Sequence, residues 1–165
     1  ELVNRVNIKK PIIMGHSFGG RVAIHYSSHH PIEKLILFGS PCVRLQKSLP
    51  LSTRILKKLK KLPGMNEFGE RMKNYIGSRD YKAASPIMRQ TLVYVVNEDL
   101  SEFAKKIEEP TLLIWGEQDT EAPIEEAKIL ENLLYDGALI VLPGTHYAYI
   151  ENLSRVVTII NNFIS

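Results

Sequence analysis

The chain has 165 residues, of which 44% are apolar and 24% are charged. This length suits one domain, and the composition is ordinary for a globular protein. No segment approaches the ~18 consecutive apolar residues that a membrane span requires, so an integral membrane protein is excluded. We expect no stable membrane anchoring.

The N-terminus has no basic region followed by an apolar stretch, so we expect no signal peptide. The first residue is Glu1 rather than methionine, which suggests a fragment or a trimmed chain. A single cysteine, Cys42, excludes an internal disulfide and fits a reducing compartment. These features predict a cytoplasmic protein, and we expect no cofactor and no bound metal.

The net charge of +3 conceals an uneven distribution, because eight Lys or Arg and no Asp or Glu lie between Lys34 and Asn66. Such a stretch can attract an anionic substrate, an acidic membrane or nucleic acid. A solvated helix face is the simpler interpretation. Aromatic residues are not interleaved with the basic ones, so we expect no nucleic-acid partner.

The spacing of apolar residues predicts an α/β fold. Nearly continuous apolar runs predict four buried parallel strands, at Lys10–Met14, Lys34–Phe38, Thr111–Trp115 and Ala138–Leu142. Helical patterns separate or follow them, at Ser17–His29, Pro123–Leu134 and Ser154–Ile164. Strands that alternate with helices of this length imply right-handed crossovers and a parallel sheet.

One long connection interrupts this alternation. Residues 40–109 contain little strand character, whereas residues 1–39 and 110–165 carry the predicted sheet. Ser52 is a candidate N-cap for a helix that ends at Pro63-Gly64, and a second helix is expected at Ser85–Val96. An insertion of this length between strands usually has a role of its own, so we expect a helical cap or lid over the core.

A G-x-S-x-G motif, Gly15-His16-Ser17-Phe18-Gly19, follows the apolar run Pro11–Met14 and precedes a helical pattern. In a strand–turn–helix context such a serine has a strained backbone, and its hydroxyl projects above the carboxyl ends of the sheet. We expect the flanking glycines to be required, because side chains there would collide with the neighbouring strand and helix. The motif therefore predicts Ser17 as a nucleophile.

A serine hydroxyl needs a base to remove its proton and an acid to orient that base. Of the five histidines, His146 directly follows the last predicted strand, at the edge where Ser17 is expected. We expect His16 to point away from the serine in so tight a turn. The remaining histidines are expected on the surface near the end of the next helix, with no cluster of further metal ligands: His25, His29 and His30.

The acid is predicted in the same way. Asp119 follows the strand Thr111–Trp115, again at a carboxyl end, while Glu117 and Glu121 remain alternatives. Other aspartates are expected to be solvated or to cap helices and turns: Asp80, Asp99 and Asp136. Cys42 is a rival nucleophile without a matched histidine, and a buried thiol is the simpler interpretation.

The resulting order of Ser17, Asp119 and His146 is the chain order of α/β-hydrolases. The chain resembles the carboxyl-terminal two-thirds of an α/β-hydrolase with a helical cap, close to the esterase, C–C hydrolase and peptidase branch. The segments that carry this resemblance are Gly15–Gly20, Leu113–Asp119 with Pro123, and Pro143–His146. By that likeness, Asp119 accepts a hydrogen bond from His146, which takes the proton of Ser17.

The resemblance also implies four more strands and a helix before the serine strand, so the N-terminal half of the usual sheet is expected to be absent. One oxyanion-hole donor is implied to be the backbone N–H of Phe18, and the second, from a His-Gly loop, is absent from the chain. Losing a single donor typically costs ~10²–10³ in rate. We therefore expect a longer native protein, or a homo-oligomer or partner that covers the exposed sheet edge.

These patterns predict a serine hydrolase, carboxylesterase-like, that forms an acyl-enzyme on an ester, amide, thioester or C–C bond. The cap favours a small to medium, largely apolar small-molecule substrate, and the basic stretch leaves room for an anionic one. Two alternatives remain open. One is a binding or receptor-like member of the fold with little turnover, and the other is an inactive fragment of a longer hydrolase.

Overall fold

A computed structural model of the chain describes residues 2–43 and 85–165. The chain divides into two compact units, one formed by Glu1–Arg44 and Asp99–Ser165 and the other by Leu45–Glu98. The helix expected to begin at Ser52 and most of the basic stretch lie outside the described residues. The first unit carries all the residues of the candidate site.

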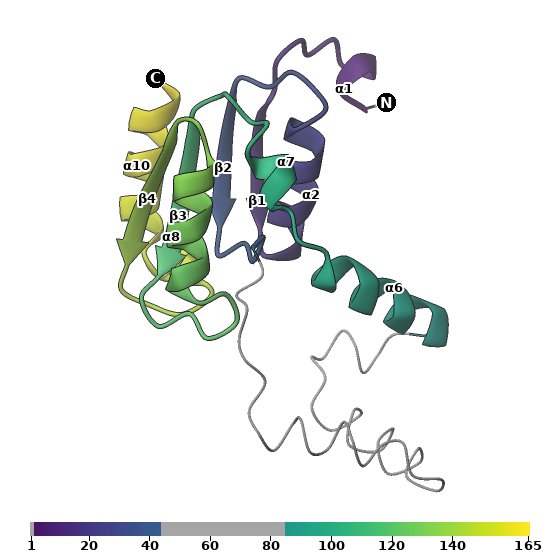
Figure 1. Cartoon of the computed structure of the whole chain (residues 1–165). Coiled ribbons are helices and arrows are strands. Elements are labelled where there is room, and N and C mark those ends of the chain that lie inside the picture. The colour runs from purple at the N-terminus through teal and green to yellow at the C-terminus, as the bar shows by residue number, and fades with distance from the viewer. Residues whose placement is uncertain (1, 44–84) are drawn as a thin grey trace, which may run out of the picture. The chain divides into compact units, whose positions relative to one another are not determined.

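The first unit contains a four-stranded, all-parallel sheet (Figure 1). Its strands are β1 (Ile12–His16), β2 (Lys34–Phe38), β3 (Thr111–Gly116) and β4 (Gly137–Leu142), arranged in the order β1-β2-β3-β4. The prediction of four parallel strands is confirmed. Strand β1 begins and ends two residues later than expected, so that His16 is its last residue.

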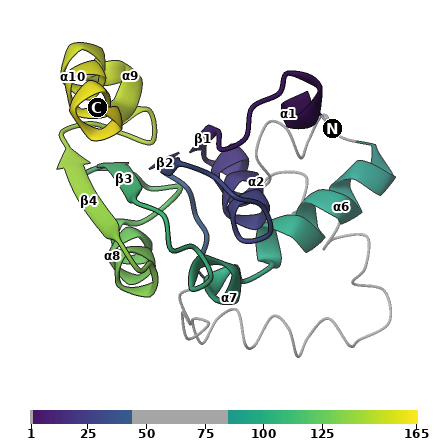
Figure 2. The ribbon, with the colours of Figure 1, turned by 90° about the horizontal axis from the view of Figure 1, so that it is seen from above.

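Helices cover both faces of the sheet (Figure 2). One face carries α2 (Phe18–Ser27), α7 (Ser101–Ala104) and α8 (Ile124–Leu133), and the other carries α9 (Ala148–Glu151) and α10 (Leu153–Ile164). A short helix, α1 (Leu2–Arg5), precedes β1. The three helices predicted in this unit are confirmed to within two residues at each end, whereas the short helices α1, α7 and α9 were too brief to produce a periodic pattern.

Alternating side chains of the central strands fill two separate cores, as expected for a pleated sheet covered on both faces. Leu35 and Leu37 of β2 pack toward α2 and α8, in one cluster with Trp115 of β3. Ile36 and Phe38 of β2 point to the opposite face, where they join the cluster formed with α10. This two-sided burial explains why the strands read as continuous apolar runs.

The bounds of the first unit differ from the expected division at residues 39 and 110. Leu100, Ala104 and Ile107 are almost completely buried in the core between the sheet and helices α2 and α8. The Leu100 N–H also donates to the Cys42 carbonyl at 2.9 Å. The chain on both sides of the insertion therefore belongs to the sheet unit, and a cap role for the second unit stays a prediction.

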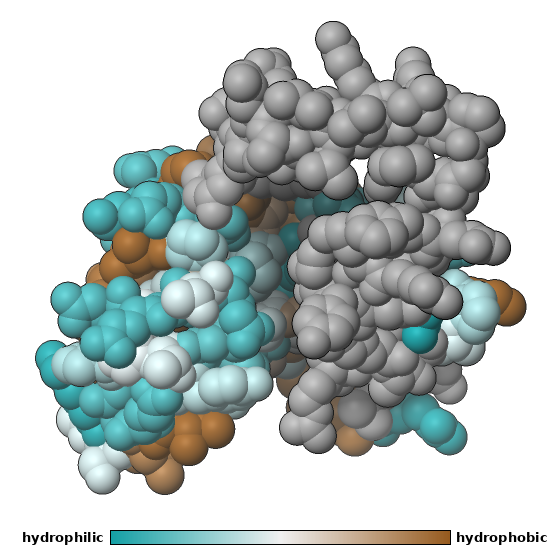
Figure 3. Space-filling view, turned by 90° about the horizontal axis from the view of Figure 1, so that it is seen from below, coloured by the Kyte–Doolittle hydropathy of each residue, from teal (hydrophilic) through white to brown (hydrophobic). Residues whose placement is uncertain are grey.

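The described part of the second unit is α6 (Pro86–Asn97), one residue away from the predicted helix at both ends. Its start follows from its sequence, because Ser85 accepts a hydrogen bond from the Met88 N–H at 3.3 Å and Pro86 occupies the first helical turn. No helix within the described ranges is both long and apolar enough to cross a membrane. On the face shown in Figure 3, hydrophilic residues predominate over the described surface, and apolar residues form separate patches.

Helix α2 approaches strands β1 and β2 closely, and two glycines permit this approach. A Cβ on Gly15 would lie 2.6 Å from the Gly19 carbonyl oxygen and 2.7 Å from the Gly20 Cα. A Cβ on Gly20 would overlap the Ser40 side chain, whereas one on Gly19 would meet nothing within 4 Å. The expectation that both glycines of the motif are needed is therefore correct for Gly15 and wrong for Gly19.

This difference gives a matched pair of substitutions within one helix. Gly20→Ala should lower the free energy of unfolding by ~1–3 kcal/mol, because the added methyl group overpacks the contact with Ser40. Gly19→Ala should leave it unchanged or raise it by up to ~1 kcal/mol, because alanine favours the helix. Urea titrations followed by circular dichroism measure both values, and equal effects of the two substitutions would show that the close approach is not present.

Candidate active site

Ser17 lies in the sharp turn between β1 and α2, with φ of 51° and ψ of −118°. This positive φ is uncommon for a residue other than glycine and costs on the order of 1–3 kcal/mol, so the surrounding structure must hold it. The Ser17 N–H donates to the Phe38 carbonyl at 2.9 Å, and the Ser17 carbonyl accepts from Gly20 at 3.1 Å. Although Ser17 occupies the N-cap position of α2, its hydroxyl makes no capping bond and remains available for chemistry.

Phe18 is the first residue of α2, so its backbone N–H has no partner within the helix. The N-terminus of a helix attracts negative charge, both through such free N–H groups and through the helix dipole. Phe18 thus stands next to the serine in the position expected for one oxyanion-hole donor.

Asp119 is held in the loop after β3 with both carboxylate oxygens in use. Its Oδ1 accepts the N–H of Glu121 at 2.9 Å and that of Ala122 at 2.8 Å. The loop is fixed further by Trp115, whose buried indole N–H donates to the Ala122 carbonyl at 2.7 Å. These bonds leave Oδ2 directed at the neighbouring loop.

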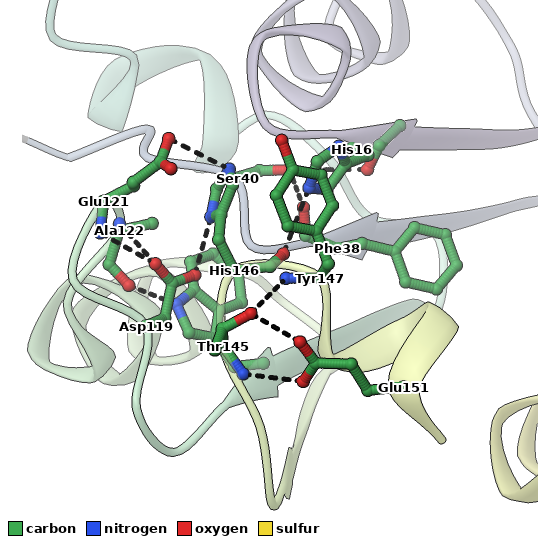
Figure 4. Close-up of polar contacts among 12 residues, drawn as sticks. His16, Phe38, Ser40, Asp119, Glu121, Ala122, Thr145, His146, Tyr147 and Glu151 are labelled. Atoms are coloured by element: carbon green, nitrogen blue, oxygen red, sulfur yellow. Dashed lines mark hydrogen bonds and ion pairs between the residues drawn. The ribbon is translucent and has the colours of Figure 1, made fainter. Parts of the chain in front are cut away.

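His146, in the loop after β4, completes a buried pair with Asp119 (Figure 4). Its Nδ1 lies 2.8 Å from Asp119 Oδ2, and only 7% of each residue is exposed. Because a carboxylate can only accept, Nδ1 carries the hydrogen and donates it. A neutral imidazole in this tautomer has its lone pair on Nε2, as a general base requires.

The structure brings Asp119 and His146 together but records no hydrogen bond between His146 and Ser17. The buried His146 Nε2 has no hydrogen-bond partner among the described residues. It lies 3.7 Å from the Oε2 of Glu121, a side chain that is 66% exposed. Glu121, which the sequence left as an alternative acid, therefore lies near the opposite nitrogen of the imidazole from Asp119.

His16 contacts the loop that carries His146, and its expected orientation away from Ser17 stays a prediction. Its Nε2 lies 3.2 Å from the His146 carbonyl oxygen, and the two imidazole rings are 4.7 Å apart between centroids. His16 is the last residue of β1 and pairs in register with Phe38. Because side chains alternate along a strand, His16 lies on the same face of β1 as Ile12, which is the face that α9 and α10 cover.

Gly39 is a further site residue that sequence reasoning missed. It follows β2 with φ of +45°, and its N–H donates to the Ile114 carbonyl at 3.1 Å. A Cβ at this position would lie 3.0 Å from Asp119 Oδ2 and 3.1 Å from His146 Nδ1. Glycine therefore serves both the left-handed backbone and the close approach of the buried pair.

The loop that carries His146 is secured on its outer side by Glu151. The Thr145 N–H donates to Glu151 Oε2 at 2.8 Å, and the Thr145 hydroxyl donates to Oε1 at 2.6 Å. These hydrogen bonds lower the pKa of the Glu151 carboxyl below its usual range. The Asn152 amide adds a bond to the Pro143 carbonyl at 2.7 Å.

The other candidates fall outside this arrangement. Cys42 is 1% exposed, and burial raises the pKa of its thiol to about 12, so it is no nucleophile at neutral pH. Asp99 accepts the Ser101 N–H at 2.9 Å, which supports its expected capping role. The histidines expected on the surface are exposed there: His25, His29 and His30. Within residues 2–43 and 85–165, no group of three or more potential ligands can hold a metal ion.

Neither a family model nor a curated protein matches the sequence. Solved structures do match it. An esterase from Exiguobacterium antarcticum is 21% identical with a TM-score of 0.69, over 100% of this chain and 70% of its own. A hydrolase from Pseudomonas aeruginosa is 21% identical with a TM-score of 0.67, over 99% of this chain and 68% of its own.

A meta-cleavage product hydrolase from Pseudomonas fluorescens is 19% identical with a TM-score of 0.67, over 99% of this chain and 67% of its own. The match extends over almost the whole chain. It agrees with the parallel sheet and with the strand–turn–helix around Ser17. The chain has the α/β-hydrolase fold and spans about two-thirds of the length of these structures.

Proposed function

We propose that the protein is a serine hydrolase in which Ser17 is the nucleophile, His146 the general base and Asp119 the residue that orients His146. The observation that carries this proposal is the buried Asp119–His146 hydrogen bond of 2.8 Å, at the same sheet edge as a strained serine with an uncommitted hydroxyl. The esterase and hydrolases of similar structure support the same class of reaction.

In the proposed reaction, Ser17 Oγ attacks a carbonyl carbon while its proton passes to His146 Nε2. The Asp119 carboxylate stabilises the resulting imidazolium, and the Phe18 N–H stabilises the negative oxygen of the tetrahedral intermediate. The leaving group departs with the proton from His146. Water then attacks the acyl-enzyme by the same route, which releases the acid and restores Ser17.

The proposed substrate is a small to medium, largely apolar molecule with an ester, amide, thioester or cleavable C–C bond, and a carboxylic ester is favoured. Structural neighbours that include an esterase and a meta-cleavage product hydrolase support this range of bonds. The proposed cap is the second unit, which is inserted between β2 and β3 and includes helix α6.

One observation favours a second candidate, a binding protein of this fold with little turnover. His146 Nε2 lies 3.7 Å from Glu121 and bonds to no described residue, so the contact that activates the serine is not made. Catalytic hydrogen bonds are often long or misaligned without substrate, and this keeps hydrolysis the leading proposal. Tight binding of an ester that is not turned over would identify the binding protein.

A fluorophosphonate probe should label Ser17, because phosphonylation requires an activated serine next to an oxyanion site. Ser17→Ala should abolish labelling. Ser28→Ala is the matched control, because Ser28 contacts His29 at 2.9 Å on the exposed end of α2 but lacks a strained turn and a buried acid. Peptide mapping after labelling identifies the residue, and an unlabelled, folded protein would contradict the proposed function.

Asp119→Asn should lower kcat for a p-nitrophenyl ester by up to ~10⁴-fold, because an amide at Oδ2 favours the wrong tautomer of His146. The backbone hydrogen bonds to Oδ1 can be retained by the amide oxygen, so the fold should persist. Glu117→Gln changes an exposed acid two residues away and should leave kcat within a few fold of the wild-type value. Equal rates for the two variants would exclude Asp119 from the proposed role.

Activity should fall toward acid pH, because a protonated imidazole cannot accept the serine proton. Measurement of kcat/KM between pH 5 and 8 tests this prediction. A rate that is independent of pH over this range would argue against a histidine base.

A further inference from the structure

The His16 imidazole connects the nucleophile turn to the loop that carries the proposed base. A carbonyl oxygen only accepts, so the 3.2 Å contact with the His146 carbonyl means that His16 Nε2 carries the hydrogen and donates it. His16 directly precedes Ser17 in the chain. One hydrogen bond therefore joins the backbone beside the serine to the backbone of His146.

Aromatic rings surround this hydrogen bond and limit the movement of His16. The ring lies 4.7 Å from that of His146, 4.8 Å from Tyr149 and 5.3 Å from Tyr147, measured between centroids. Partial burial lowers the pKa of His16, and the positive form of His146 lowers it further. The hydrogen bond to the His146 backbone and the charges of Asp119 and Glu121 act in the opposite direction but are outweighed.

The Asp119 hydrogen bond alone does not fix the direction of the His146 imidazole. It holds the ring at a single atom, Nδ1, about which the ring can still tilt and move Nε2. A second anchor on the His146 backbone limits this movement by fixing the main chain from which the ring extends, and His16 supplies it from the last residue of β1. A misplacement of ~1 Å can cost ~10²-fold in rate, so such an anchor matters for proton transfer.

We propose that His16 is a positioning residue that holds the His146 backbone in register with Ser17 by donating a hydrogen bond to the His146 carbonyl. This inference rests on the proposed function for its effect on the rate. The geometric part of the inference, that loss of the donor moves the His146 ring, is testable without any activity.

Two substitutions separate the hydrogen bond from simple packing. His16→Gln keeps a side-chain N–H near the position of Nε2, whereas His16→Phe keeps an aromatic ring and loses the donor. His16→Leu is a second donor-free variant for use if His16→Phe does not fold. His25→Phe is the matched control, since His25 is exposed on α2 and has no contact with His146.

We expect His16→Phe to lower kcat for a p-nitrophenyl ester by about 10- to 100-fold with little change in KM, since ground-state binding does not need the aligned base. His16→Gln should recover most of the rate, and His25→Phe should match the wild type. A Phe variant with wild-type kcat would overturn the proposal. The proposal would also be overturned if His16→Phe and His16→Gln lost kcat to the same extent and lost thermal stability to the same extent, because that result indicates packing alone.

The NMR signal of the His146 Nδ1 proton provides a readout that does not depend on turnover. This proton is protected by burial and by its bond to Asp119, and Asp119→Asn identifies its signal by removing it. The signal should shift or broaden in His16→Phe and remain as in the wild type in His16→Gln. An unchanged signal in His16→Phe overturns the positioning role. If the wild type hydrolyses no ester, the proposed function is refuted. A shifted signal in His16→Phe relative to the wild type would still support the positioning role.

The pH dependence of stability gives a third readout. A lowered His16 pKa means that the unfolded chain, with an ordinary value of 6.5, binds a proton before the folded one does. The stabilisation is therefore complete above pH 6.5 and is lost as the pH falls toward the folded pKa. His16→Gln should lose less stability between pH 7 and pH 5 than the wild type, and an equal loss would contradict a half-buried, neutral His16.

Discussion

The buried hydrogen bond between Asp119 and His146 requires that the loops after β3 and β4 remain at a fixed separation. Each loop is anchored independently. Trp115 holds one through the Ala122 carbonyl, and Glu151 holds the other through Thr145. Since a buried charged group is costly unless its partners are in place, these anchors stabilise the site as well as shape it.

A second constraint acts where α2 packs against β1 and β2. The absence of side chains at Gly15 and Gly20 lets the helix begin immediately after the strand, and this geometry holds Ser17 at a positive φ. The packing of the cores on both faces of the sheet offsets the free-energy cost of this strained backbone. Gly39, directly after β2, lies against the buried Asp119–His146 pair, and the next residue, Ser40, lies against Gly20 of α2. The constraint on the loops and the constraint on the helix therefore act on neighbouring residues after β2.

The arrangement of the sheet unit was largely predictable from sequence. Continuous apolar runs identify strands buried on both faces, and the helices have stripes of apolar residues at regular spacing. Asp119 and His146 were found because residues after parallel strands gather at one edge. The contact of His16 with His146 was not predicted, although the alternation of side chains along β1 places His16 on the same face as Ile12, in register with Phe38.

Other features could not be predicted because they depend on distances between segments far apart in sequence. The need for glycine at position 20 depends on where Ser40 lies, and the tolerance at Gly19 depends on the absence of any atom within 4 Å of an added Cβ. The position of Glu121 near His146 Nε2 depends on the path of an exposed loop after β3. The division of the chain near Asp99 depends on Leu100 and Ile107, whose short segment has no periodic pattern.

The central claim is that Ser17 forms a covalent intermediate with the help of His146. The most direct measurement is peptide mapping of the protein after acid quenching during turnover of p-nitrophenyl acetate, with the wild type and His146→Ala compared. The account predicts an acetyl group on Ser17 that accumulates rapidly in the wild type and is absent from the variant. Turnover without an acylated serine, or acylation of a different residue, would contradict it.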